Sequence, residues 1–184
     1  PFEFLNSPEA EASGRFLCLS DCQTAHPILR PNQGETRIAS TELSGDQAMM
    51  TSLNKEIAFI DPSITDLTGF LNGLRVDVEG IVLNKFESAF EQINRVLSDR
   101  AAVSNLHLIT HGQSGQLNFT SGTVDAARLE YDAEVLALIG MKLASGSIIN
   151  LWSCEVAAGD QGRSFVNALS LAIGVKVASS DQLV

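Results

Sequence analysis

Residues 106–112, Leu-His-Leu-Ile-Thr-His-Gly, show the pattern that decides the fold, a short apolar run followed by a polar turn. Four more runs of this kind occur, and amphipathic stretches separate them. The five runs are residues 57–60, 80–83, 106–109, 148–152 and 175–179. Continuous apolar runs are typical of parallel strands that are covered on both faces. We therefore predict that these runs form one parallel sheet.

The stretches between the runs predict helices. A short helix is expected near residues 66–74, and three further stretches place apolar residues at helical spacing. These positions are Phe86, Phe90, Ile93 and Leu97 in the first, Leu136, Ile139 and Leu143 in the second, and Phe165, Leu169 and Ile173 in the third. Gly174 is expected to end the last helix. The alternation predicts an α/β fold with right-handed crossovers and helices on both faces of a mainly parallel sheet.

Residues 111–126 interrupt this alternation. They are polar and rich in glycine, and Leu-Asn-Phe followed by Thr-Ser-Gly is typical of a small β-hairpin.

The composition is that of a globular protein. The 184 residues are 45% hydrophobic and 18% charged, and 22 acidic against 12 basic residues give a net charge of -10. This balance argues against nucleic-acid partners and against binding to an anionic membrane. No apolar run is long enough to span a membrane, so membrane insertion is not expected, and no signal peptide is visible.

The sequence changes character near residue 54. Residues 1–53 hold four of the five prolines and show no sustained periodicity, so we predict an irregular, pro-like leader before a domain at residues 54–184. Cys18 and Cys22 form a C-x3-C pair in the leader, near His26. No second pair of ligands follows, so two ordinary thiols are predicted here rather than a metal site.

Two residues that suit nucleophilic chemistry follow consecutive apolar runs. His111 comes after the third run and Cys154 after the fourth. If the two strands are neighbours, the residues lie at one edge of the sheet, where ligand sites occur in parallel sheets. Imidazole can activate a thiol, and the amides of Gly112 and Cys154 are candidate donors to an oxyanion. The alternative is that Cys154 is an ordinary buried packing residue.

The residues that surround this pair resemble a known family. LHLITHGQSGQL (106–117) and INLWSCEVAAGDQG (149–162) resemble the caspase-like (clan CD) cysteine peptidases, in which a His-Gly ends one strand and a Cys the next. They resemble more closely an uncharacterised bacterial domain near the N-terminus of giant secreted repeat proteins of the cadherin or haemolysin type. The resemblance covers residues 55–184 and implies a three-layer sandwich with His111 as general acid/base, Cys154 as nucleophile and the Gly112 and Cys154 amides as oxyanion hole.

The resemblance also implies where a substrate binds. In caspase-like folds the pocket for the residue before the scissile bond lies at the ends of the first and fifth strands. Those ends carry Asp61, Ser179 and Asp181 here, and Glu155 follows the nucleophile. Acidic groups there favour a basic residue, whereas caspases select Asp. The alternative for Asp61 is a turn cap in Asp-Pro-Ser.

We therefore expect a cysteine endopeptidase domain of a larger secreted or cell-surface bacterial protein, which cleaves its own parent chain or another polypeptide. No cofactor is required. The resemblance allows activation by calcium, which no D-x-D-x-D-G loop supports. A sixth strand, common in this fold, would lie beyond residue 184, so the domain is expected to be truncated. The alternative is a non-catalytic module of the same fold in an adhesin or surface repeat protein. A flavodoxin-like small-molecule site ranks last, because Asp61 and Pro62 occupy the position of a phosphate-binding loop.

Overall fold

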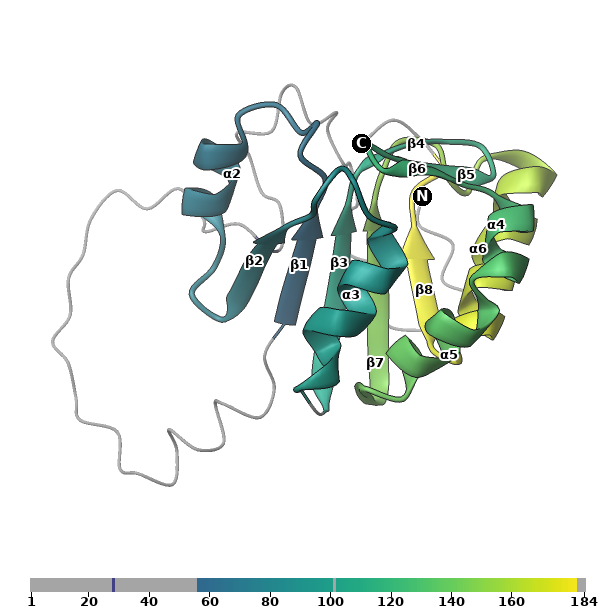
Figure 1. Ribbon diagram of the computed structural model, residues 1–184. Helices are drawn as coiled ribbons and strands as arrows, with labels where there is room; N and C mark the ends of the chain where they lie inside the picture. Colours follow the sequence, from purple (N-terminus) through teal and green to yellow (C-terminus); the bar gives the residue numbers. More distant parts are fainter. Residues whose placement is uncertain (1–27, 29–55, 101, 182–184) are drawn as a thin grey trace, which may run out of the picture.

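A five-stranded parallel sheet forms the centre of the molecule (Figure 1). The computed structural model describes residues 28, 56–100 and 102–181. Within these ranges, the strands follow the order β2-β1-β3-β7-β8. They are β1 (Glu56–Ile60), β2 (Val78–Val82), β3 (Val103–Ile109), β7 (Leu143–Trp152) and β8 (Lys176–Ser179). Each strand overlaps one of the predicted runs, so the predicted α/β class and the mainly parallel sheet are confirmed.

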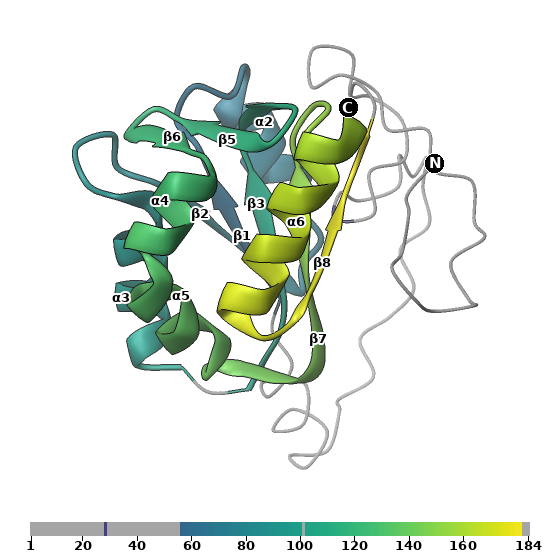
Figure 2. The ribbon, with the colours of Figure 1, turned by 90° about the vertical axis from the view of Figure 1, so that its right-hand side faces the viewer.

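Helices cover both faces of this sheet, as Figures 1 and 2 show. The helices are α2 (Leu67–Gly73), α3 (Ala89–Ser98), α4 (Ala126–Tyr131), α5 (Ala133–Gly140) and α6 (Gly159–Ile173). On one face, α3, α5 and α6 bury Phe90, Leu136 and Leu169 against the sheet. On the other face, α2 packs near β1 and β2. The predicted three-layer arrangement is therefore confirmed.

The two helical faces correspond to two apolar clusters. The larger cluster contains Phe59 of β1 together with Phe90, and each fully buried side chain of this size contributes about 1.5–3 kcal/mol. The smaller cluster lies under α2 and contains Ile60, Trp152 and Ile28. Ile28 is 1% exposed, and its carbonyl accepts a hydrogen bond from the amide of Arg75 at 2.9 Å. This residue therefore belongs to the folded core.

Two predicted helix positions are wrong. Phe86 lies before α3 and is 84% exposed, because Asn84 folds residues 84–87 into a turn by accepting from the Phe86 amide at 2.8 Å. Gln92 fixes this turn with hydrogen bonds to the backbone of Asn84 and Glu87. Leu143 is the first residue of β7 rather than part of a helix, because α5 ends at Gly140 and the next residues begin to pair with β3.

The polar stretch after β3 forms a second, antiparallel sheet. Its strands are β4 (His111–Gln113), β5 (Gln116–Phe119) and β6 (Gly122–Val124), in that order. The predicted hairpin corresponds to β5 and β6, whereas β4 and the short helix α4 were not predicted. In Figure 1 this small sheet lies over the carboxyl ends of β3, β7 and β8. It therefore covers the edge at which parallel sheets carry their sites.

The predicted leader falls almost entirely outside the described residues, as do Cys18, Cys22 and His26. The predicted boundary near residue 54 and the two ordinary thiols stay predictions. Among the helices of the described ranges, none is both long and apolar enough to cross a membrane. Gly174 ends α6 in the left-handed conformation, with φ of 81°, as predicted.

Candidate active site

His111 and Cys154 follow neighbouring strands at the same level. β3 and β7 pair directly, and Ile109 lies opposite Trp152. His111 comes two positions after Ile109, and Cys154 comes two positions after Trp152. The amide of Thr110 donates to the carbonyl of Trp152 at 3.4 Å, so the pairing continues beyond the last strand residues. The adjacency on which the sequence interpretation depends is confirmed.

Gly112 packs directly against the backbone that carries the cysteine. A Cβ atom on Gly112 would lie 3.1 Å from the carbonyl oxygen of Cys154, 2.9 Å from Cβ of Ser153 and 2.4 Å from Cγ2 of Val156. These distances leave no room for a side chain. Glycine is therefore required for the His-Gly turn to approach the Cys154 loop, defined as residues 153–158.

The geometry of β4 directs the Gly112 amide away from β5. Ser114 and Gly115 form a two-residue turn, and Gln113 lies opposite Gln116 across it. Pairs that flank such a turn are hydrogen-bonded, and the pairs alternate along antiparallel strands. Gly112, which lies opposite Leu117, therefore belongs to a non-hydrogen-bonded pair. Its N–H group therefore points away from β5.

Hydrogen bonds hold the Cys154 loop on two sides. From the β4–β5 turn, the Gly115 amide donates to the Val156 carbonyl at 3.1 Å, and the Ser114 hydroxyl donates to the Ala158 carbonyl at 2.6 Å. From the other side, the Ala157 amide donates to the carbonyl of Ser180 at 3.0 Å. Three loops that follow β3, β7 and β8 thus meet around the cysteine.

The backbone next to Cys154 is strained. Glu155 has φ of 54°, in the left-handed region that non-glycine residues rarely adopt. Strain of this kind persists only where surrounding contacts enforce it, and it clusters at functional sites. The loop then leads into the N-terminus of α6, whose dipole favours negative charge nearby.

Neither candidate residue is fully buried. His111 is exposed, and Cys154 is half-buried and carries a thiol that forms no disulfide. Cys154 is thus not among the fully buried residues of the core, and its role as a nucleophile rather than a packing residue stays a prediction. A thiol beside an imidazole-bearing strand, with an amide pointing out of β4, is an arrangement suited to nucleophilic attack on a carbonyl.

Asp61 serves a turn rather than the surface. It is 1% exposed, and its Oδ1 accepts from the Ser63 amide at 2.9 Å and from the Ser63 and Thr120 hydroxyls at 2.5 Å. Its Oδ2 accepts from the Thr120 amide at 2.7 Å. Burial opposes the charged form, but the hydrogen bonds from Ser63 and Thr120 outweigh it and hold the pKa of Asp61 below its ordinary value. The structure thus shows the turn cap that the sequence analysis gives as the alternative, and it offers no exposed Asp61 oxygen to a substrate.

The other three predicted substrate residues lie at the same edge as Cys154. Glu155 is exposed, Asp181 is half-buried, and Ser179 is buried at the end of β8, opposite Leu151 of β7. The hydroxyls of Ser179 and Ser153 are buried without a hydrogen-bond partner in the described part of the chain. Their contact with a substrate stays a prediction.

Three residues that shape this edge were not predicted from the sequence. Thr120 holds Asp61, Ser114 holds the Cys154 loop, and Ser153 brings a buried hydroxyl next to the cysteine. Only Ser153 had a sequence signal, namely its position directly before Cys154. In the described ranges, no three His, Cys, Asp or Glu side chains are grouped to hold a metal ion.

Comparison with known proteins identifies the family. A family model described as "Domain of unknown function (DUF4347)" matches residues 57–184, which is more than half of the chain. The chain belongs to the DUF4347 family. The match includes every strand and helix from α2 to β8, and thus the whole candidate site of this DUF4347 domain. No curated protein matches the chain.

Replacing Gly112 by alanine tests the close approach of the two loops. We expect Gly112→Ala to lower the free energy of unfolding by about 1–3 kcal/mol, because the new methyl group overlaps Val156 and Ser153. Urea denaturation of the variant and the parent measures this difference. Ser164→Ala, at an exposed position of α6, is the control and should change the value by less than about 0.5 kcal/mol. Equal stability of Gly112→Ala and the parent would contradict the packing described here.

Proposed function

We propose that this DUF4347 domain is a caspase-like cysteine endopeptidase with His111 and Cys154 as its catalytic pair. The observation that carries the proposal is the position of the pair. Ile109 and Trp152 lie opposite each other on adjacent parallel strands, and each candidate residue follows one of them by two positions. The backbone of Gly112 lies against the Cys154 loop, which fixes the approach of the two residues. The resemblance of the two motifs to clan CD peptidases supports the same roles.

The proposed reaction proceeds through an acyl-enzyme. His111 takes the thiol proton, and the Cys154 sulfur attacks the carbonyl carbon of the scissile peptide bond. The oxygen becomes an anion that accepts hydrogen bonds from the amides of Gly112 and Cys154. The C–N bond then breaks, and His111 gives its proton to the leaving amine. Water, deprotonated by His111, attacks the thioester, which releases the carboxylic acid and restores the thiol.

The substrate of the proposed peptidase is a polypeptide with a basic residue before the scissile bond. Glu155 follows the nucleophile, and Ser179 and Asp181 flank Ser180, whose carbonyl accepts from Ala157 of the Cys154 loop. The two carboxylates of this group would bind an arginine or lysine side chain. Asp61 is not part of this pocket, because its carboxylate is buried in the turn. The parent chain or a neighbouring surface protein would be the target, in a secreted or cell-surface bacterial protein.

Alkylation of the thiol separates the peptidase from a non-catalytic module. We expect iodoacetamide at neutral pH to modify Cys154 of the full chain selectively, as detected by mass spectrometry of digested protein. His111→Gln should slow this modification by about 10-fold or more, because the imidazole no longer promotes the thiolate. Cys18 and Cys22 are internal controls whose rates should not change. If His111→Gln leaves the rate at Cys154 unaltered, the catalytic pair is refuted and the non-catalytic module is favoured.

A further inference from the structure

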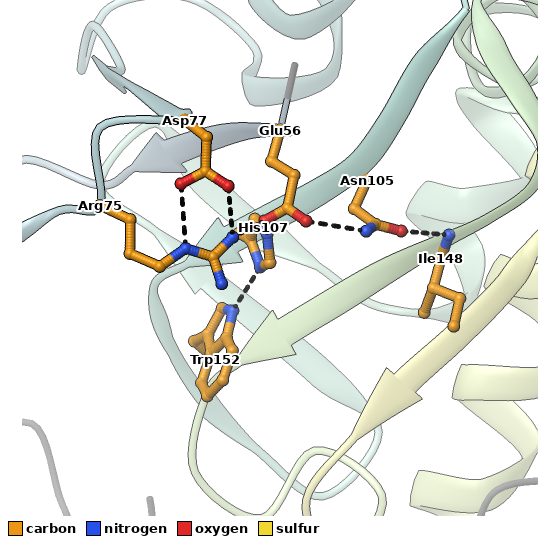
Figure 3. Close-up of polar contacts among 7 residues, drawn as sticks. All are labelled: Glu56, Arg75, Asp77, Asn105, His107, Ile148 and Trp152. Carbon is orange, nitrogen blue, oxygen red and sulfur yellow. Dashed lines mark hydrogen bonds and ion pairs between the residues drawn. The ribbon is translucent and has the colours of Figure 1, made fainter. Parts of the chain in front are cut away.

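A polar network centred on two buried side chains lies on the sheet face opposite α3, α5 and α6 (Figure 3). Its centre is His107 of β3, which is 4% exposed. Its Nδ1 accepts a hydrogen bond from the indole Nε1 of Trp152 at 3.1 Å, and its Nε2 lies 3.1 Å from Oε2 of Glu56. Both ring nitrogens are therefore engaged inside the protein.

These contacts fix the protonation state of His107. The indole N–H is a donor only, so Nδ1 must carry no hydrogen when it accepts this bond. Nε2 then carries the hydrogen and donates it to Glu56. A protonated imidazole would place a second N–H group against the indole N–H and break the bond. The link between His107 and Trp152 therefore exists only with the neutral imidazole.

The rest of the network holds Glu56 in place. Oε1 accepts from the Asn105 side chain at 3.1 Å, and Oε2 accepts from Arg75 at 2.8 Å. Arg75 also pairs with Asp77, as Figure 3 shows. Asn105 in turn accepts from the amide of Ile148 at 3.0 Å, next to the shift in register between β3 and β7. The network thus connects β1, β3 and β7.

Trp152 joins this network to the candidate site. It is the last residue of β7 and lies two positions before Cys154. Its buried side chain is held by His107, and its carbonyl accepts from Thr110, the residue before His111. Trp152 therefore contacts the chain at both places where it leaves the sheet, before His111 and before Cys154.

We propose that Glu56, His107 and Trp152 are positioning residues for Cys154, and that protonation of His107 releases the Trp152 anchor and lowers the reactivity of the thiol. The inference rests on the proposed function for its catalytic meaning, but the anchor itself is a property of the fold. Loss of the anchor would make the Cys154 thiol less reactive in acid, in addition to any effect of the protonation of His111 or Cys154 themselves.

The charges around His107 set the pH range of this effect. In the described ranges, the charged groups that act on it are Glu56 of β1 and Arg75 of the α2–β2 connection, which also pairs with Asp77, while β7 contributes the neutral Trp152. Burial disfavours the imidazolium most strongly and exceeds the opposing effect of Glu56, so the pKa of His107 lies below its ordinary value. The anchor is therefore complete above the ordinary histidine pKa of about 6.5 and is lost as the pH falls through the lower folded value.

The chain contains a single tryptophan, so its fluorescence reports on the anchor directly. We expect the emission of the full chain to change with pH, with a midpoint below about 6.5, because the imidazolium alters the surroundings of the indole. His107→Gln should remove this transition, since its amide can accept from Trp152 and donate to Glu56 at every pH in the range. Emission that stays constant between neutral pH and acid unfolding in the parent chain would refute the switch.

The rate of Cys154 alkylation tests the positioning role. At pH 7, His107→Leu should slow the reaction about 3- to 10-fold, the size of one lost hydrogen bond, while His107→Gln should restore most of the rate. The ratio of parent to His107→Gln rates should fall in acid, where only the parent loses its anchor. Trp152→Phe keeps an aromatic side chain but removes the indole N–H donor. This variant is used in place of His107→Leu if far-UV circular dichroism shows that His107→Leu is unfolded. Unchanged rates in the folded variants would overturn the proposal.

Peptide cleavage distinguishes the failure of this inference from the failure of the proposed function. If the variants behave as expected and the parent cleaves no peptide, the anchor stands and the endopeptidase is refuted. If the parent cleaves peptides through Cys154 and the anchor variants react at the parent rate, the positioning role alone is refuted.

Discussion

Cys154→Ala is expected to lower kcat/KM for peptide cleavage by about 10³-fold or more, because no acyl-enzyme forms without the sulfur. The substrates are fluorogenic peptides with Arg, Lys or Asp before the scissile bond, and hydrolysis of the Arg and Lys peptides should predominate in the parent. The half-buried thiol contributes little to packing, so the free energy of unfolding should stay within about 1 kcal/mol of the parent value.

The same chain offers matched controls for this result. Cys18→Ala and Cys22→Ala make the identical chemical change at the two other cysteines and should retain the parent rate. His111→Ala should be as inactive as Cys154→Ala, and the double variant should be no worse than either, because the two groups act as a unit. Cleavage that persists in Cys154→Ala would mean that another group is the nucleophile, and the assignment would then be wrong.

Asp61→Ala is expected to destabilise the domain by about 2–4 kcal/mol, because it removes a buried carboxylate that accepts four hydrogen bonds from Ser63 and Thr120. Urea denaturation measures the loss. Asp160→Ala removes a carboxylate whose side chain is 99% exposed, so this control should change stability by less than about 0.5 kcal/mol.

The pH dependence of stability gives a second test of Asp61. The pKa of this carboxyl is lower in the folded chain than the ordinary value of 3.8, so its contribution is present above that value. The contribution disappears as the pH falls through the folded pKa. Asp61→Asn should therefore lose stability relative to the parent at neutral pH, and the difference should shrink in acid. A difference that stays constant down to the acid transition would contradict the role of the charged form.

The central sheet follows from the sequence because its signals are local. Each apolar run is short, continuous and bounded by polar turns, and the regular alternation with amphipathic stretches leaves few arrangements for parallel strands. The same regularity accounts for the position of His111 and Cys154, since two runs that become neighbours present their next residues at one edge.

The features that the sequence does not reveal depend on contacts between distant segments. Asp61 and Thr120 are 59 positions apart, so a buried acceptor could not be told from a surface carboxylate by the Asp-Pro-Ser motif alone. Phe86 continues the helical spacing of α3, yet local hydrogen bonds of Asn84 and Gln92 favour a turn instead. Leu143 continues the spacing of α5, but pairing with β3 decides its conformation.

The small β4-β5-β6 sheet is secured to the large sheet at two separate points. Thr110 binds Trp152 at the start of β4, and Thr120 binds Asp61 at the turn after β5. The spacing between the proposed acid/base and the proposed nucleophile is consequently set by strand pairing and by a few side chains within the fold, such as Asp61, and not by the exposed Glu155 next to the cysteine. If the proposed function holds, exposed residues beside the cysteine could change the preferred target while the two attachment points keep His111 and Cys154 in register.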